Sequence, residues 1–493
     1  MEHDQFLGPQ AGNFGAAVTR RAMLRRVGGG IAGASLSTRV ASASAPPSPA
    51  MMTLSAYMSE AGSRALPASV IEKAKQHVLD TFAAMISGSE LPPGRAALRF
   101  ARAYGGPRIA TVAVSDLVCG PIEAALANGV MAHADETDDS WPNGWHPGCN
   151  VVPAALAVGE QFAITGMHFL RAVTLGYDIG ARVLTCLRPG VFETHKSTHS
   201  IGGIFGSAAA AGCAANLNAQ QMRWLLDYTA QQSSGIAAWD RDTDHIEKGF
   251  AFGGMPARSG VTSALLVHSG WTGVDDILSG EDNFLLANAP HGDMSALTDK
   301  LGERFEIVRT SIKKWTVGTP IQAPLDALEI MLKKHPLDVD QVKEVIVRMA
   351  PGSVVDNREM PDVCIQHMLA LMLIDKTATF RSAHDKPRMQ DREILRQRAK
   401  VRLDPQGGGN RTSDGRPALL TIVLNDGTRL SEDVTAVLGT LDNPMSRDQV
   451  VSKCRDLMTP VLSAATSGKL IERCLDLENM KSIREFRPLL ERR

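Results

Sequence analysis

A long series of alanine-rich helical segments constrains what this chain can fold into. In LPASVIEKAKQHVLDTFAAMISG, apolar side chains at Ile71, Ala74, Val78 and Phe82 recur at the spacing of one helical face. Four later segments have the same texture: GPIEAALANGVMAHA, VVPAALAVGEQF, GGIFGSAAAAGCAANL and PARSGVTSALLVHSG. Because alanine and glycine let helices approach closely, these segments predict a large, tightly packed helical domain.

The pattern changes to short strands after about residue 310. VKEVIVRMA and RAKVRLDP are typical of strands, and ALLTIVLNDGTRLSEDV predicts a hairpin that turns at Asp426-Gly427. The segment NPMSRDQV then begins another helix, in which Ser446 and Gln449 have the spacing of a capping box.

A chain of 493 residues is too long for one ordinary core, so we expect two domains. We predict a mainly α protein with a large, discontinuous all-helical domain at residues 52–308 and 439–493. A smaller α/β lid domain should occupy residues 309–438. The cleft between the two domains is the expected place for a site.

Composition excludes several classes of protein. The balance of 52 basic and 53 acidic residues argues against nucleic-acid binding through bulk charge. No P-loop and no G-x-G-x-x-G segment is present. The seven cysteines include no C-x-x-C pair, which argues against an iron–sulfur cluster or a structural zinc site.

The first 45 residues have the organisation of an export signal. TRRAMLR contains the Arg20-Arg21 pair, and the apolar run VGGGIAGASL and the small-residue segment ASASAPP follow it. This order predicts export to the periplasm by the twin-arginine route. A disordered basic tail on a cytoplasmic protein is the alternative.

The stretch HADETDDSWPNGWHPG gathers an unusual number of titratable groups. We expect a helix that continues to Pro142, with His133, Glu136 and Ser140 on one face. His146 follows in a short rigid loop that can turn its imidazole toward that face. A carboxylate, a hydroxyl and a histidine at a helix end could serve proton transfer, although a solvated acidic loop is the simpler interpretation.

Removal of a proton α to a carboxylate needs a base and a nearby positive charge. His146 could be the base, and His195 and His199 are the other candidates. Lys248 could hold a substrate carboxylate and balance the enolate charge, unless it is only an exposed helix charge. Further cations that could bind an anion are Arg258, Lys313 and Lys314. The surrounding WDRDTDHIEK is expected to be a solvated loop at the mouth of the cleft.

Metal binding is not expected. His195 and His199 are spaced four residues apart, but the glutamate of an H-E-x-x-H motif is missing. Asp135, Asp138 and Asp139 lack the ligand spacing and the glycine of a calcium loop. We expect Asp139 to be buried and hydrogen-bonded near the helix end.

Five segments, in order along residues 52 to the end, resemble the MmgE/PrpD family, which includes 2-methylcitrate dehydratase and cis-aconitate decarboxylase. They are NGVMAHADETDDSWPNGWHPG, IGGIFGSAAAA, KGFAFGGMPARSGVTSALL, SIKKWTVGTPIQAPLDAL and DNPMSRDQVVSKC. The resemblance implies a helical domain with an α/β lid, usually as a homodimer. It also implies lyase chemistry on small polycarboxylates without a metal or another cofactor.

Site residues can be carried over from the family's motifs. The first motif gives Glu136, Ser140 and His146, and the third gives Lys248. Gln322 and His367 fall at lid positions that the resemblance directs toward the site.

This chain departs from the family's pattern at several positions. Glu136 stands where the family has aspartate, with Asp135 adjacent. Ser197 stands at a position that is usually histidine, flanked by His195 and His199. These changes alter charge and hydrogen-bond donors in the pocket, so they bear on the substrate more than on the fold.

The sequence therefore predicts a metal-independent lyase of the dehydratase type that acts on an acid of the 2-methylcitrate or aconitate kind. A cis-aconitate-type decarboxylase, an isomerase or epimerase, and a non-catalytic organic-acid-binding protein remain as alternatives.

Overall fold

The computed structural model describes residues 46–142, 144–188, 195–350, 355–405 and 416–492. The predicted export segment at residues 1–45 lies outside the described residues. Among the described helices, none is long and apolar enough to cross a bilayer. The prediction of a mainly α protein with a smaller α/β part is confirmed.

The helical part is built on one large hydrophobic core, which residues from Met51 to Ile312 and from Met445 to Leu490 share. Its longer helices are α2 (Pro49–Glu60), α3 (Ala68–Gly88), α4 (Pro92–Tyr104), α5 (Pro121–Ala132), α6 (Gly148–Phe162), α7 (Gly166–Leu187), α8 (Thr198–Ala214), α9 (Ala219–Gln232) and α11 (Met255–His268). The chain returns to this core with α18 (Arg447–Met458), α19 (Ala464–Leu475) and α20 (Arg487–Leu490). A short ribbon pairs β1 (Ala110–Thr111) with β2 (Val118–Cys119).

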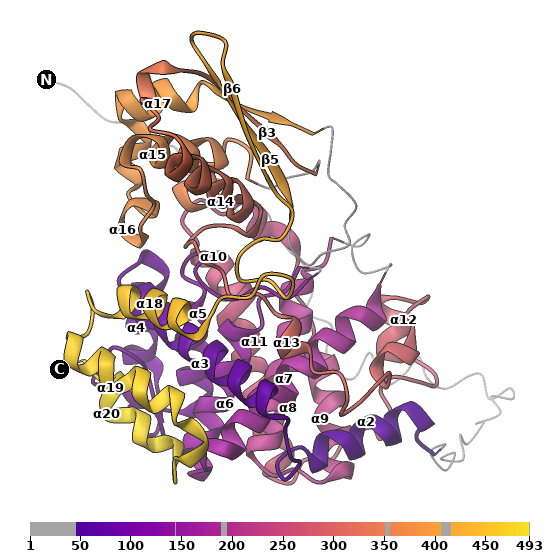
Figure 1. Cartoon of the computed structure of the whole chain (residues 1–493). Helices are drawn as coiled ribbons and strands as arrows, with labels where there is room; N and C mark the ends of the chain where they lie inside the picture. The colour runs from indigo at the N-terminus through magenta and orange to yellow at the C-terminus, as the bar shows by residue number, and fades with distance from the viewer. Residues whose placement is uncertain (1–45, 143, 189–194, 351–354, 406–415, 493) are drawn as a thin grey trace, which may run out of the picture. The chain divides into compact units, whose positions relative to one another are not determined.

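Helix α8 runs through the middle of this core, in contact with α6, α7, α9 and α11 (Figure 1). Glycines of α7 let it approach α8 closely. A Cβ on Gly176 would lie 2.8 Å from the Gly206 carbonyl oxygen, and one on Gly180 would lie 2.6 Å from the Gly202 carbonyl oxygen. The two helices can pack this closely only because small residues, mainly alanine and glycine, line their contact.

The α/β part has a second hydrophobic core, with residues from Trp315 to Val437. Its sheet has the order β4-β3-β5-β6, with β3 and β4 parallel and the other neighbours antiparallel. The strands are β3 (Val342–Arg348), β4 (Val401–Asp404), β5 (Ala418–Leu424) and β6 (Arg429–Val434). The helices are α14 (Thr319–Lys334), α15 (Ile365–Asp375), α16 (Phe380–Ala383) and α17 (Arg392–Arg398). Helix α14 packs on β5 and β6, and α15 packs on α14 and α17 (Figure 1).

Several local predictions are confirmed. The hairpin of β5 and β6 turns through Asp426 and Gly427, where φ is +88° and glycine is favoured. Ser446 and Gln449 form the predicted capping box at the start of α18. That helix then brings Lys453 into contact with the backbone of the acidic stretch, as Lys453 Nζ lies 3.0 Å from the Thr137 carbonyl oxygen.

Candidate active site

The acidic stretch is buried rather than solvated, and it is not helical. Helix α5 ends at Ala132, and His133 is its C-cap with φ −120° and ψ 39°. The prediction that the helix continues to Pro142 is therefore wrong. The Asp135 carboxylate accepts hydrogen bonds from the N–H and the hydroxyl of Thr137, so local side-chain bonds replace the helical ones. The loop that results directs its carboxylates inward.

Asp138 joins two imidazoles. Its Oδ2 lies 3.0 Å from His133 Nδ1, and its Oδ1 lies 3.0 Å from His146 Nδ1. Although burial raises the pKa of Asp138, the two histidines hold it well below its usual value. A charged carboxylate fixes the proton of each ring on Nδ1 and leaves the Nε2 lone pair free. His146 thus has the hydrogen-bonding arrangement of an oriented general base.

The two rings of this pair have different environments. His133 is fully buried, and burial lowers its pKa to about 4 despite the charge of Asp138. It therefore stays neutral near pH 7. His146 keeps 6% of its surface exposed, at the edge of the cluster nearest His199. Of the two, His146 is better placed to meet a ligand.

Glu136 lies between two lysines from distant parts of the chain. Lys248, in the short helix α10 (Ile246–Gly249), forms an ion pair with Glu136 Oε1. Lys313 Nζ lies 3.2 Å from Oε2 of the same carboxylate and 3.8 Å from Asp138 Oδ1. Burial raises the pKa of Glu136, but the two ammonium charges hold it well below its usual value. The lysines and the imidazoles thus share one site.

Phe252 forms an apolar wall beside the histidines. Its ring stacks on His199 at 3.7 Å between centroids and on His133 at 4.5 Å. It belongs to a π-helical segment (Phe250–Gly254) that lies against α5, and a Cβ on Gly253 would lie 2.0 Å from the Gly129 carbonyl oxygen. Glycine at this crossing lets the ring reach the imidazoles.

His199 and Lys248 mark the side of the cluster that solvent reaches. Both are only partly buried, as is Trp239, which lies edge-on to His199 at 5.4 Å between centroids. Burial lowers the pKa of His199 well below its ordinary value, and the other histidines of the cluster lower it further. This side of the cluster therefore presents an imidazole and an ammonium group to solvent.

The lid contributes two reciprocal contacts that the sequence reasoning missed. His245 Nε2 of the helical part lies 3.0 Å from Oδ2 of Asp362 in the lid. His384 Nε2 of the lid lies 3.0 Å from Oδ2 of Asp135 in the helical part, as an ion pair rather than an aligned hydrogen bond. The interpretation of WDRDTDHIEK as a solvated loop is therefore wrong at His245, which is buried. Its place three residues before Lys248 was the available signal.

Two predicted residues lie within helices α14 and α15 of the lid. The Gln322 side chain binds the backbone of Trp315 and Val317 at 2.8 to 3.0 Å, which uses both its oxygen and its nitrogen. His367 is fully buried in α15, and neither ring nitrogen has a partner among the described residues. Burial lowers its pKa to about 4. Among the described residues, neither side chain hydrogen-bonds to a residue of the cluster.

Other predicted residues have observed contacts that do not involve the lysines or the imidazoles of the cluster. Ser197 caps α8 through the Ser200 N–H. His195 is exposed with φ +56°, and Arg258 is half-buried on α11. Lys314 binds Glu329 at 2.7 Å.

Ser140 lies where the helical part meets the start of the lid. Its backbone pairs with that of Ser311, and its Oγ accepts a hydrogen bond from Thr319 at 3.4 Å. Asp139 is buried, as predicted, and accepts hydrogen bonds from Tyr177 at 2.6 Å and from the Gly148 N–H at 2.8 Å.

Two groups of described side chains have ligand atoms close enough to share a metal ion: His133 with Asp138 and Cys149, and His133 with Glu136 and His245. Charge argues against a cation in the second group, because both oxygens of Glu136 already contact ammonium groups. In the first group, burial raises the pKa of the Cys149 thiol well above its usual value, which opposes the thiolate that a metal needs.

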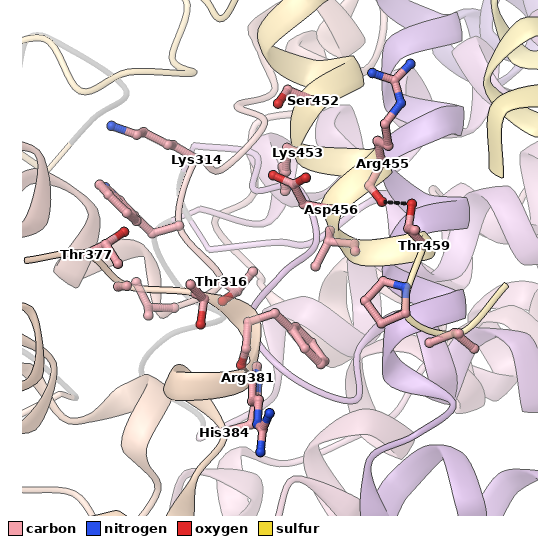
Figure 2. Close-up of a pocket in the computed structure, with 18 of the residues that line it drawn as sticks. Lys314, Thr316, Thr377, Arg381, His384, Ser452, Lys453, Arg455, Asp456 and Thr459 are labelled. Carbon is pink, nitrogen blue, oxygen red and sulfur yellow. Dashed lines mark hydrogen bonds between the residues drawn. The ribbon is translucent and has the colours of Figure 1, made fainter. Parts of the chain in front are cut away.

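A groove of about 1500 Å³ lies between the lid and α18 (Figure 2). His384 and Lys453 line it, and through them it touches Asp135 and the backbone of Thr137. Its described lining does not include His146, Lys248 or Lys313. The groove is therefore adjacent to the cluster and separate from these three side chains.

Comparison with known proteins agrees with the resemblance noted in the sequence. The MmgE/PrpD N-terminal domain model matches residues 52–296, and the MmgE/PrpD C-terminal domain model matches residues 315–477. A cis-aconitate decarboxylase from Aspergillus terreus is 23% identical over 467 residues, which cover 86% of this chain and 92% of that protein.

The cis-aconitate decarboxylase of Homo sapiens is 24% identical over 448 residues, which cover 86% of this chain and 90% of that protein. That of Mus musculus is 24% identical over 437 residues, which cover 83% and 87%. Since the two domain models together span most of its length, this chain belongs to the MmgE/PrpD family.

Proposed function

We propose that this protein is a lyase of the dehydratase type that acts on a small di- or tricarboxylate of the 2-methylcitrate or aconitate kind. The observation that carries the proposal is the Asp138-oriented imidazole of His146 in one cluster with Lys248 and Lys313. A base beside two ammonium groups suits removal of a proton α to a carboxylate.

His146 takes the α-proton on Nε2, and Asp138 stabilises the ring when it becomes positive. The electron pair of the broken C–H bond spreads into the substrate carboxylate. Lys248 and Lys313 stabilise that charge, as fixed cations do in a water-poor site. Without a ligand, Glu136 occupies both lysines, so a substrate carboxylate would compete with it for Lys248.

Decarboxylation of cis-aconitate is the second candidate. The named relatives from Aspergillus terreus, Homo sapiens and Mus musculus support it, at 23 to 24% identity. The same lysines would bind the carboxylates, and a protonated imidazole would supply a proton to the carbanion. The two reactions differ in whether water or carbon dioxide is lost, so products distinguish them.

Export through the Arg20-Arg21 segment and assembly as a homodimer belong to this proposal. Replacing both arginines with lysine should leave the protein in the cytoplasm. An unchanged protein that fractionates with the cytoplasm and keeps residues 1–45 would contradict the export prediction.

The experiment is a set of crystals soaked separately with citrate, 2-methylcitrate, cis-aconitate and succinate, followed by a turnover assay on each acid. We expect a tricarboxylate at Lys248 and conversion of the bound acid. Binding without turnover would favour a non-catalytic organic-acid-binding protein.

A further inference from the structure

His245 is a buried histidine that the mechanism above does not use. It is the N-cap residue before α10 and lies in the left-handed region, at φ +63°, which is uncommon for a residue with a Cβ. Its Nε2 lies 3.0 Å from Asp362, and its Nδ1 is buried without a partner among the described residues. An orphaned polar atom on a strained residue is a marker of a functional position.

The surroundings of His245 define a small polar space. A ring nitrogen of His245, a ring nitrogen of His133 and an oxygen of Glu136 all lie within 4.8 Å of one another. One atom at their centre would be no more than about 2.8 Å from each, which is hydrogen-bond distance for an oxygen. Because Lys248 and Lys313 already contact Glu136, a neutral oxygen suits this space better than a divalent cation.

We propose that His133, Glu136 and His245 form a subsite for the hydroxyl group of a β-hydroxy acid, and that His245 is the general acid that protonates this hydroxyl as it leaves. The inference rests on the proposed dehydratase function. It assigns the base and the acid to different histidines, His146 and His245, each with its own carboxylate, Asp138 and Asp362.

The step balances. His146 takes the proton from carbon, and the C–H electron pair becomes the new C=C bond. The C–O bond breaks with its electron pair on oxygen, which takes a proton from the doubly protonated ring of His245 and leaves as water. His146 ends with one proton more and His245 with one fewer, and exchange with solvent restores both.

Asp362 makes this acid depend on the lid. It is the carboxylate that can balance the charge of His245, and it lies in the lid segment Pro361–Val363. The lid therefore supplies the partner of His245 from outside the helical part. Asp362 is thus a positioning residue that completes the acid only when the lid is in place.

The test separates proton removal from loss of the hydroxyl. 2-Methylcitrate is incubated in D₂O with wild-type protein, His245→Asn, Asp362→Asn, His146→Ala and the exposed control His335→Gln. Asparagine tolerates φ above zero, so His245→Asn should fold, and its melting temperature is measured. We expect His245→Asn to keep deuterium exchange at the α-carbon within about threefold and to lose at least about a hundredfold in water elimination.

Asp362→Asn should show the same split with a smaller loss and an unchanged KM, and His146→Ala should lose both exchange and elimination. An analogue with fluoride in place of the hydroxyl should restore elimination by His245→Asn, because fluoride leaves without a proton.

Equal loss of exchange and elimination in folded His245→Asn, or full retention of both, would overturn the acid assignment. Activity that a chelator abolishes and one divalent ion restores would also overturn it. Wild-type protein without turnover would instead remove the proposed function itself.

Discussion

The Nδ1 atom of His146 lies 3.0 Å from Oδ1 of Asp138, and both side chains come from one loop that follows α5. The contact fixes the ring's tautomer. In Asp138→Asn the side chain can turn its amide N–H toward Nδ1, which reverses the donor and acceptor. We expect kcat to fall by about 10²–10⁴-fold with little change in KM. Steady-state kinetics beside the exposed control Asp448→Asn measure this, and an unchanged kcat would exclude His146 as the oriented base.

Lys248, which is partly buried, forms an ion pair with the buried Glu136, so stability and activity must be separated at this position. Lys248→Met should reduce turnover by at least about a hundredfold, because it removes a cation that the developing charge would meet. It should also lower the melting temperature, because Glu136 loses one of its two counter-ions. The double variant Glu136→Gln/Lys248→Met should recover the melting temperature without recovering turnover. Recovery of both would show that Lys248 is only structural.

His384 gives the contact between lid and helical part a pH dependence. Burial lowers the pKa of His384, but Asp135 and Asp362 raise it to about 9. Its folded pKa is thus above the ordinary value of about 6.5. The stability it contributes is complete below pH 6.5 and is lost as pH rises through 9.

The measurement is the free energy of unfolding of wild-type protein and His384→Gln between pH 6 and pH 9.5. The stabilisation of wild type over the variant should shrink across this range, with His335→Gln as the matched control. A difference that does not change with pH would contradict the charged contact with Asp135.

Chelator treatment should leave turnover and melting temperature unchanged. The group His133, Glu136 and His245 has the spacing for a cation, but two ammonium groups oppose it. Turnover is assayed after dialysis against EDTA and then with single divalent ions added back. Activity restored by one ion alone would require a different mechanism.

The sequence predicted the elements of the fold well, because they depend on local patterns. Apolar spacing marked α3, and the Asp426-Gly427 turn marked the hairpin of β5 and β6. The end of α5 could not be predicted from local patterns. The conformation of the loop after it depends on buried contacts that distant residues make with Asp138 and Asp139.

The candidate site was predictable only in part for the same reason. Glu136, His146, Lys248 and Lys313 stood out as residue types in motifs, and the structure brings them together. Nothing in the sequence around His245 specifies Asp362 as its partner, since 117 residues separate them. Gln322 shows the converse. It stands at a motif position, but its side chain forms hydrogen bonds with the nearby backbone of Trp315.

The most direct test of the lyase proposal is NMR in D₂O of wild-type protein and His146→Ala with 2-methylcitrate and, separately, with cis-aconitate. We predict loss of water from the first acid by wild type, or loss of carbon dioxide from the second, and a fall of at least about a hundredfold in His146→Ala. Deuterium entering the α-carbon without loss of water or carbon dioxide would contradict the account and indicate an isomerase.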